Sequence, residues 1–244
     1  SKPGEAYLAT DRLKNLFAGV SGVMLVDDDY ACLRGENIRD LLEACGVSRH
    51  LRPLAAPNAL TWTEKCDLRA QSGYPHTSGH NDHVEDWSLE GLDSLLETLP
   101  KLSIEECRAK AELLWEELAQ VEARSGKGVF TGAYTWTHYG NRRAPPFDTE
   151  FIRTLNSTAW IPDANGELQR PEFILFEPLG WKDSPFLQSK IKFKPPIIDV
   201  LAKEAGVEPG VLDLLKKHGL TSVADLVSRL GIDEDDEEKD EADS

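Results

Sequence analysis

The sequence predicts an α+β fold that is rich in helices and contains short strands, with a β-hairpin around residues 158–176. Three observations predict it. Residues 159–171 contain apolar residues, an Asp-Ala-Asn-Gly turn and a second strand-like run, the pattern of a hairpin. Residues 103–123 begin with the Ser-x-x-Glu pattern of a capping box and continue with an apolar stripe at helical spacing. Residues 129–139 alternate aromatic with small or polar side chains, which is typical of a strand.

The other elements follow from apolar periodicity and from the residues that interrupt it. Gly46 follows one periodic segment and Pro100 follows another, so both mark the ends of helices. We expect helices at 7–17, 38–45, 86–99, 147–155, 197–205, 209–218 and 223–230. We also expect a buried strand at 23–26, a strand at 173–176, a strand or short helix at 60–68, and a polar loop at 71–84.

Composition divides the chain into three regions. We expect a helix-rich α+β region at 1–150, the hairpin with a C-terminal helical region at 151–232, and an acidic disordered tail at 233–244. Nine carboxylates and one lysine give the tail a net charge of −8, half of the total of −16. Such a block repels itself and has no apolar surface to bury. The body is also net negative, which argues against general nucleic-acid binding.

The remaining composition is that of an ordinary soluble protein, with 40% hydrophobic and 29% charged residues. No apolar run reaches the roughly 18 residues that a membrane helix needs, and the first residues do not resemble a signal peptide. We therefore expect a cytoplasmic protein with no membrane partner. Because the chain starts at Ser1 and contains a single methionine, we also expect it to be part of a longer protein.

Two groups of residues are candidates for ligand binding. His76, His80 and His83 could hold a metal on a helix, but proline, serine and glycine in this stretch favour a surface loop. Arg142 and Arg143, near Trp136 and Tyr139, could bind an anionic ligand through arginine forks and ring stacking, although an ordinary surface role is the simpler interpretation.

Other short patterns have structural explanations. Residues 125–128 lack the glycine spacing of a phosphate-binding loop and are expected to form a turn. Asn156 lies in a glycosylation pattern but fits a turn or cap better. Lys216, Lys217 and Gly219 lie in a helical module that could grip a DNA backbone, and packing or protein contact is favoured there. Cys32, Cys45, Cys66 and Cys107 are widely spaced and are expected to be reduced and at least partly buried. No catalytic residue, cofactor or metal site is predicted.

Several short segments of the sequence together resemble a known family. They are Phe151-Ile152, Leu155-Asn156, Trp160-Ile161-Pro162, Gly166-Glu167-Leu168, Phe193-Lys194-Pro195, Gly206-Val207 and Leu230-Gly231-Ile232, with Leu51-Arg52-Pro53 upstream. They are similar to a region of bacterial sacsin-like and No Vein-like proteins, large chains built around a GHKL-type ATPase module. That module carries a D-x-G-x-G loop and an asparagine-bearing helix, and neither motif is present here.

The resemblance implies a region downstream of the ATPase, without its nucleotide chemistry. We therefore expect a non-catalytic interaction or coupling module whose partners are other domains of the parent chain or other proteins. The alternative is a nucleic-acid-associated module of a bacterial defence or repair system, which a basic surface patch would favour. An independent hydrolase would instead need a deep pocket with convergent titratable groups.

Overall fold

The computed structural model of the protein describes residues 6–26, 36–74 and 80–196. The chain divides into two compact units, Ser1–Phe193 and Lys194–Ser244, and all the helices and strands of the described residues lie in the first. The helices expected at 197–205, 209–218 and 223–230, the tail at 233–244 and the residues Cys32, His76, Lys216, Lys217 and Gly219 lie outside the described residues.

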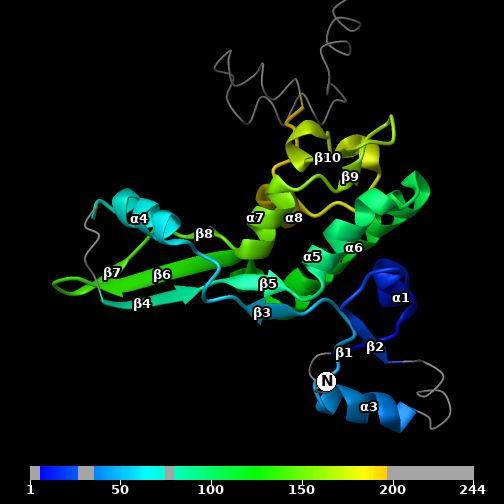
Figure 1. The fold of residues 1–244 in the computed structure, drawn as a ribbon, viewed down its shortest axis with the longest axis horizontal. Coiled ribbons are helices and arrows are strands. Elements are labelled where there is room, and N and C mark those ends of the chain that lie inside the picture. The colour runs from blue at the N-terminus through cyan, green and yellow to red at the C-terminus, as the bar shows by residue number, and fades with distance from the viewer. Residues whose placement is uncertain (1–5, 27–35, 75–79, 197–244) are drawn as a thin grey trace, which may run out of the picture. The chain divides into compact units, whose positions relative to one another are not determined.

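The predicted α+β class is confirmed (Figure 1). The helices are α1 (Asp11–Phe17), α3 (Glu36–Ala44), α4 (Trp62–Gln71), α5 (Leu92–Thr98), α6 (Ile104–Ser125), α7 (Glu150–Ser157) and α8 (Pro185–Lys190). The strands are β1 (Ala6–Leu8), β2 (Met24–Val26), β3 (Pro53–Ala55), β4 (His80–Glu85), β5 (Trp87–Leu89), β6 (Thr131–Thr137), β7 (Asn141–Arg143), β8 (Phe147–Asp148), β9 (Ile161–Pro162) and β10 (Leu168–Gln169). Within the described residues, no helix is long and apolar enough to cross a membrane.

Helix α6 forms the centre of the main hydrophobic core. The predicted capping box is confirmed: Ser103 Oγ accepts from the Glu106 amide, and the Glu106 carboxylate accepts from the Ser103 amide at 3.0 Å. One side of the helix buries Cys107, Ala111, Leu114, Trp115, Leu118 and Val121. These residues pack in one cluster with side chains from α1, α5, α7 and the hairpin β9–β10. The apolar stripe read from the sequence is therefore the surface on which the other elements assemble.

Two buried charges on α6 were not predicted, and both bind main-chain groups of other segments. Lys110 Nζ donates to the carbonyls of Asn15, Leu16 and Ala18 at 2.6, 2.9 and 3.0 Å, which satisfies the C-terminal end of α1. Burial lowers the pKa of Lys110. Glu117 Oε2 accepts from the Leu51 amide at 3.3 Å. The hydrogen bonds of each charged group thus offset the cost of its desolvation, and they also fix a neighbouring segment.

The C-terminal hairpin is confirmed, although its strands have only two residues each. β9 and β10 pair antiparallel, and Gly166 adopts a φ of 87° in the turn. Trp160 is fully buried, and its indole nitrogen donates to the Leu155 carbonyl at 3.0 Å. The ring therefore joins the hairpin to the end of α7.

The strand expected at 173–176 is wrong. Pro171–Phe173 forms a 3-10 turn in which the Ile174 amide donates to the Pro171 carbonyl at 2.9 Å. Phe176 then packs 5.1 Å from the ring of Trp115, whose indole nitrogen donates to the Lys182 carbonyl at 2.8 Å. The apolar side chains of this segment pack one by one against a cluster of aromatic rings. The segment is therefore apolar without forming a strand.

Other expectations were wrong in type or extent. The polar loop expected at 71–84 is wrong from residue 80 onward, because β4 pairs there with β6. The helix expected at 86–99 begins only at Leu92, because residues 87–89 pair with β3. Residues 60–68, left open between strand and helix, belong largely to α4, which starts with a capping box of Thr61 and Glu64. The strand at 23–26 is present as β2 but is only partly buried, and Met24 is 45% exposed.

Trp160→Ala should lower the free energy of unfolding by roughly 3–5 kcal/mol, because it removes a fully buried indole. A matched control is Trp62→Ala, since that ring is 57% exposed and should cost much less. Denaturant melts of both variants test this, and equal losses would show that Trp160 is not the anchor of the hairpin.

The turn of the hairpin should make stability depend on pH. The amides of Glu167 and Asn165 donate to the Asp163 carboxylate at 2.9 and 2.8 Å and lower its pKa. A lowered folded-state pKa contributes stability above the unfolded value of about 4, and this contribution is lost as the pH falls through the folded pKa. Wild type should therefore exceed Asp163→Asn in stability at neutral pH and approach it in acid. Parallel stability curves across that range would contradict this assignment.

Candidate functional site

The strands β4, β6 and β7, with helix α4, form a second structural region that we call the arm. Its core is separate from the main one and consists of Leu60, Leu68, Val84, Tyr134, Trp136 and Ala144. Strand β6 lies in the middle of the sheet, between β4 and β7, and α4 packs on one side (Figure 1). Side chains along β6 alternate between buried and partly exposed, so the arm has a covered face and an open face.

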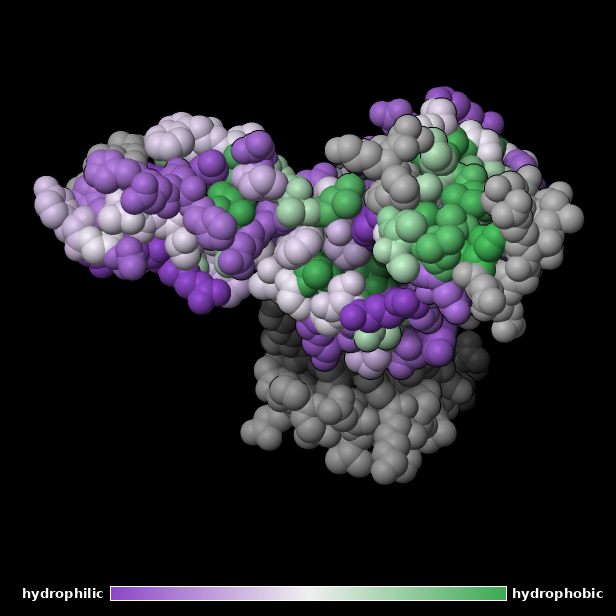
Figure 2. Space-filling model, turned by 90° about the horizontal axis from the view of Figure 1, so that it is seen from below, coloured by the Kyte–Doolittle hydropathy of each residue, from purple (hydrophilic) through white to green (hydrophobic). Residues whose placement is uncertain are grey.

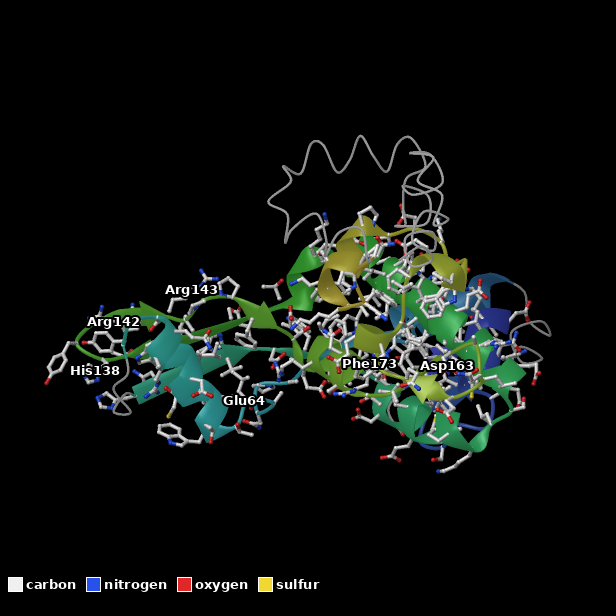
Figure 3. The ribbon with its side chains drawn as sticks, turned by 90° about the horizontal axis from the view of Figure 1, so that it is seen from above. Glu64, His138, Arg142, Arg143, Asp163 and Phe173 are labelled. Carbon is white, nitrogen blue, oxygen red and sulfur yellow. The ribbon has the colours of Figure 1, made fainter. Side chains whose placement is uncertain are left out.

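The alternation of β7 separates the two arginines that the sequence placed together. Arg142 is the register partner of Trp136, whereas Arg143 is the partner of Thr135. Trp136 belongs to the buried set of β6 and Thr135 to the partly exposed set, so Arg142 lies on the covered face and Arg143 on the open face. A joint fork of both arginines on one anion is therefore not formed. Figure 3 shows both side chains on the β6–β7 hairpin, with His138 near its turn.

A buried arginine organises the covered face. Arg69 is 1% exposed, and its guanidinium donates to the Tyr134 hydroxyl and to the Asp82 carboxylate, both at 2.8 Å. It also lies 5.4 Å from the ring centroids of Trp62 and Trp136. Burial raises the pKa of Tyr134, against the opposing effect of the Arg69 hydrogen bond. Sequence reasoning missed Arg69, because nothing local distinguishes it from a surface arginine on α4.

Arg142 continues this network toward the tip of the hairpin. Its guanidinium lies 4.3 Å from the Tyr74 ring centroid, and its Nε donates to the His138 carbonyl at 3.3 Å. Tyr139 follows at the tip with a φ of 47° and is 93% exposed. A positive φ is unfavourable for a bulky residue, so the turn holds this ring outward at a conformational cost.

The open face contains a shallow polar hollow of about 350 Å³. It is lined by Trp136 and Arg142, whose register places their side chains on the covered face, and by five other polar residues: Asn81, Thr135, Thr137, Asn141 and Arg143. Thr135 is paired with Arg143 and Thr137 with Asn141, so four of these five stand in two neighbouring cross-strand pairs. Seen from the side away from α4, this end of the molecule is mainly hydrophilic (Figure 2).

Asn81 lines the hollow because strand β4 is irregular at this point. The register between β4 and β6 shifts between His80 and His83, and Asn81 there adopts a φ of 53°. Asparagine tolerates this conformation better than most residues. A bulge of this kind changes the direction of a side chain relative to a regular strand.

The predicted histidines are not brought together as a metal site by the part of the chain that is described. His80 and His83 stand on β4 as register partners of Thr137 and Thr135, and His83 Nε2 lies 3.5 Å from the Glu85 carboxylate. Among described residues, no group of three His, Cys, Asp or Glu side chains is placed to hold a metal ion.

Asp86 joins the arm to the main core and was also missed. Its carboxylate accepts from the amides of Trp87 and Glu150 at 2.8 and 2.7 Å and pairs with Arg153 at 3.1 Å. It thus caps α7, for which the side chain of the N-cap residue Thr149 makes no capping bond. Buried at 2% exposure between β4 and β5, Asp86 connects three elements.

The other sequence candidates have structural roles. Residues 127–130 form a 3-10 turn, as expected for the glycine-rich segment. The Asn156 side chain donates to the Lys190 carbonyl at 3.0 Å and accepts from the Lys192 amide at 2.8 Å, so it secures the segment after α8. Cys107 is buried, but Cys45 is exposed, contrary to expectation.

A second polar cluster surrounds Glu117 on α6. The Glu117 carboxylate is 3.3 Å from His50 Nδ1 and 3.1 Å from Arg12 Nε, although the latter contact lacks hydrogen-bond alignment. Ser48 Oγ bonds the main-chain carbonyl of His50 at 2.7 Å. Since the serine hydroxyl does not contact the imidazole, the cluster is not a nucleophile–base pair and positions residues 48–52.

Comparison with protein-family models, with curated proteins and with solved structures finds no match to this chain.

Asp86→Ala should lower the free energy of unfolding by about 3 kcal/mol, because it leaves Arg153 and two amides without their acceptor. Glu85→Gln is the matched control, since the neighbouring carboxylate is 64% exposed and, among the described residues, pairs with His83 alone. Chemical denaturation measures both. A loss as small as that of the control would show that Asp86 does not join the arm to the core.

Proposed function

We propose that the chain is a non-catalytic interaction or coupling module of a larger sacsin-like GHKL-type ATPase protein, and that the arm is the part that contacts the partner. The observation that carries the proposal is Tyr139, whose ring is 93% exposed at the tip of the hairpin in an unfavourable backbone conformation. Exposed aromatic rings contribute large contact areas at low entropy cost when a partner covers them.

The construction of the arm supports this role. Arg69 and the rings around it give the arm its own core, and Arg142 attaches the hairpin to Tyr74. A rigid support of this kind reduces the conformational entropy lost on binding. The assignment to a sacsin-like parent rests on the sequence resemblance and belongs to the proposal.

Photo-crosslinking tests the proposal directly. We would place benzoylphenylalanine at position 139 in the full-length parent protein and, as a control, at position 173, where Phe173 is 55% exposed on a different part of the fold. Position 139 is expected to form crosslinks to peptides of the ATPase module or of a partner protein, at a yield well above that of position 173.

Two results would overturn the proposal. Equal yields at positions 139 and 173 would show that the tip is an ordinary exposed surface. Crosslinks from position 139 to nucleic acid rather than protein would instead support the alternative of a nucleic-acid-associated module.

A further inference from the structure

We propose that the hollow on the open face of the arm binds a carboxylate group, presented by an extended acidic segment of the partner protein. The inference rests on the proposed function and names the chemistry of the partner. It concerns Arg143 and the other polar residues of the open face, whereas the interaction proposed above concerns Tyr139 at the tip of the hairpin.

The side chains of the hollow are available to a ligand. Within the described parts of the chain, Arg143, Asn81, Asn141, Thr135 and Thr137 form no side-chain hydrogen bond or ion pair. Together they offer a guanidinium, two carboxamides and two hydroxyls. On the covered face, by contrast, Arg69, Asp82 and Tyr134 bind one another. The five side chains of the hollow therefore offer donors that the described chain does not use.

The strand register brings these donors within reach of one small group. Directly opposed residues have Cβ atoms about 5 Å apart, and next neighbours on the same face are about 7 Å apart. Arg143 with Thr135, and Asn141 with Thr137, are such neighbouring pairs. A guanidinium can bind a carboxylate through two parallel hydrogen bonds, and the hydroxyls and amides can donate to the same oxygens or to the adjoining main chain.

The charge of the site fits a monoanion. Among the residues lining the hollow, the positive charges belong to Arg142 and Arg143, and Arg142 faces the other side of the sheet. On the other side of β6, His83 is the register partner of Thr135, and its ring lies 3.5 Å from the Glu85 carboxylate. Nucleic acid or a phosphate dianion would call for several cations, but a single carboxylate is matched by a single guanidinium.

The position of the hollow suits an extended ligand. In the described sheet, β7 is paired with β6 and stands at the end of the strand order. An extended polypeptide can lie along such an edge, and its alternate side chains then reach one face of the sheet. Arg142 holds β7 from the covered side through Tyr74 and the His138 carbonyl, so Arg143 is presented from a fixed strand.

The test measures binding of a fluorescein-labelled peptide of alternating glutamate and threonine to the whole chain by anisotropy, at low salt. The key variants are Arg143→Gln on the open face and Lys65→Gln on α4, which each remove one positive charge from the arm, the second outside the hollow. We expect Arg143→Gln to weaken binding about tenfold or more and Lys65→Gln to weaken it less than about threefold. Arg143→Lys keeps the charge without the fork and should be intermediate. Thermal melts confirm that each variant is folded, and Asn141→Ala supplies a second test of the hollow if Arg143→Gln unfolds.

Three results would overturn the proposed carboxylate site. Equal losses for the two glutamine variants would show a general charge effect and overturn the site. Absence of peptide binding at millimolar concentration would do the same. Competition by inorganic phosphate that is stronger than competition by glutarate would overturn the choice of carboxylate. If the peptide binds at Arg143 while position 139 gives no specific crosslinks, the site stands and the proposed role of the tip fails.

Discussion

The fold depends on the burial of helix α6, which is possible because its two inward-facing charges have partners. Lys110 binds three carbonyls at the end of α1, and Glu117 binds the main chain at Leu51 and the side chains of Arg12 and His50. An unpaired charge at either position would cost several kcal/mol in a core of this kind. The same contacts fix the segments that border α6, so the polar groups determine the arrangement of elements that the apolar stripe alone would leave less specific.

The arm depends on a different constraint, the two-residue period of its strands. That period directs Tyr134, Trp136 and Arg142 toward α4, and Thr135, Thr137 and Arg143 toward the open face. The covered face uses its polar groups internally around Arg69. On the open face, the five polar side chains of the hollow form no side-chain hydrogen bond within the described chain, and the hairpin turn holds Tyr139 outward. The covered face therefore stabilises the arm, whereas the open face has polar groups that a ligand could bind.

The sequence predicted those elements whose conformation is determined by neighbouring residues in the chain. The capping box at Ser103, the alternation along β6 and the Asp-Ala-Asn-Gly turn each contain their own signal within a few residues, and all three are confirmed. Strands β4 and β5 were missed because their pairing with β6 and β3 is a long-range property, and because the residues of β4 are mainly polar. The burial of Arg69, Asp86 and Glu117 was missed for a similar reason, since their partners are distant in sequence. The candidate pair Arg142 and Arg143 lies on strand β7, and strand alternation, which their adjacency in the sequence did not reveal, places the two side chains on opposite faces.

We propose that the open face of the arm is the binding surface and that the covered face supports it. Amide hydrogen exchange of the full chain, with and without the glutamate–threonine peptide, locates the bound surface without any substitution. We expect slower exchange in residues 131–143 and 80–85 when the peptide is bound, with α6 unchanged. Unchanged exchange in the arm at saturating peptide, or protection confined to the main core, would contradict it.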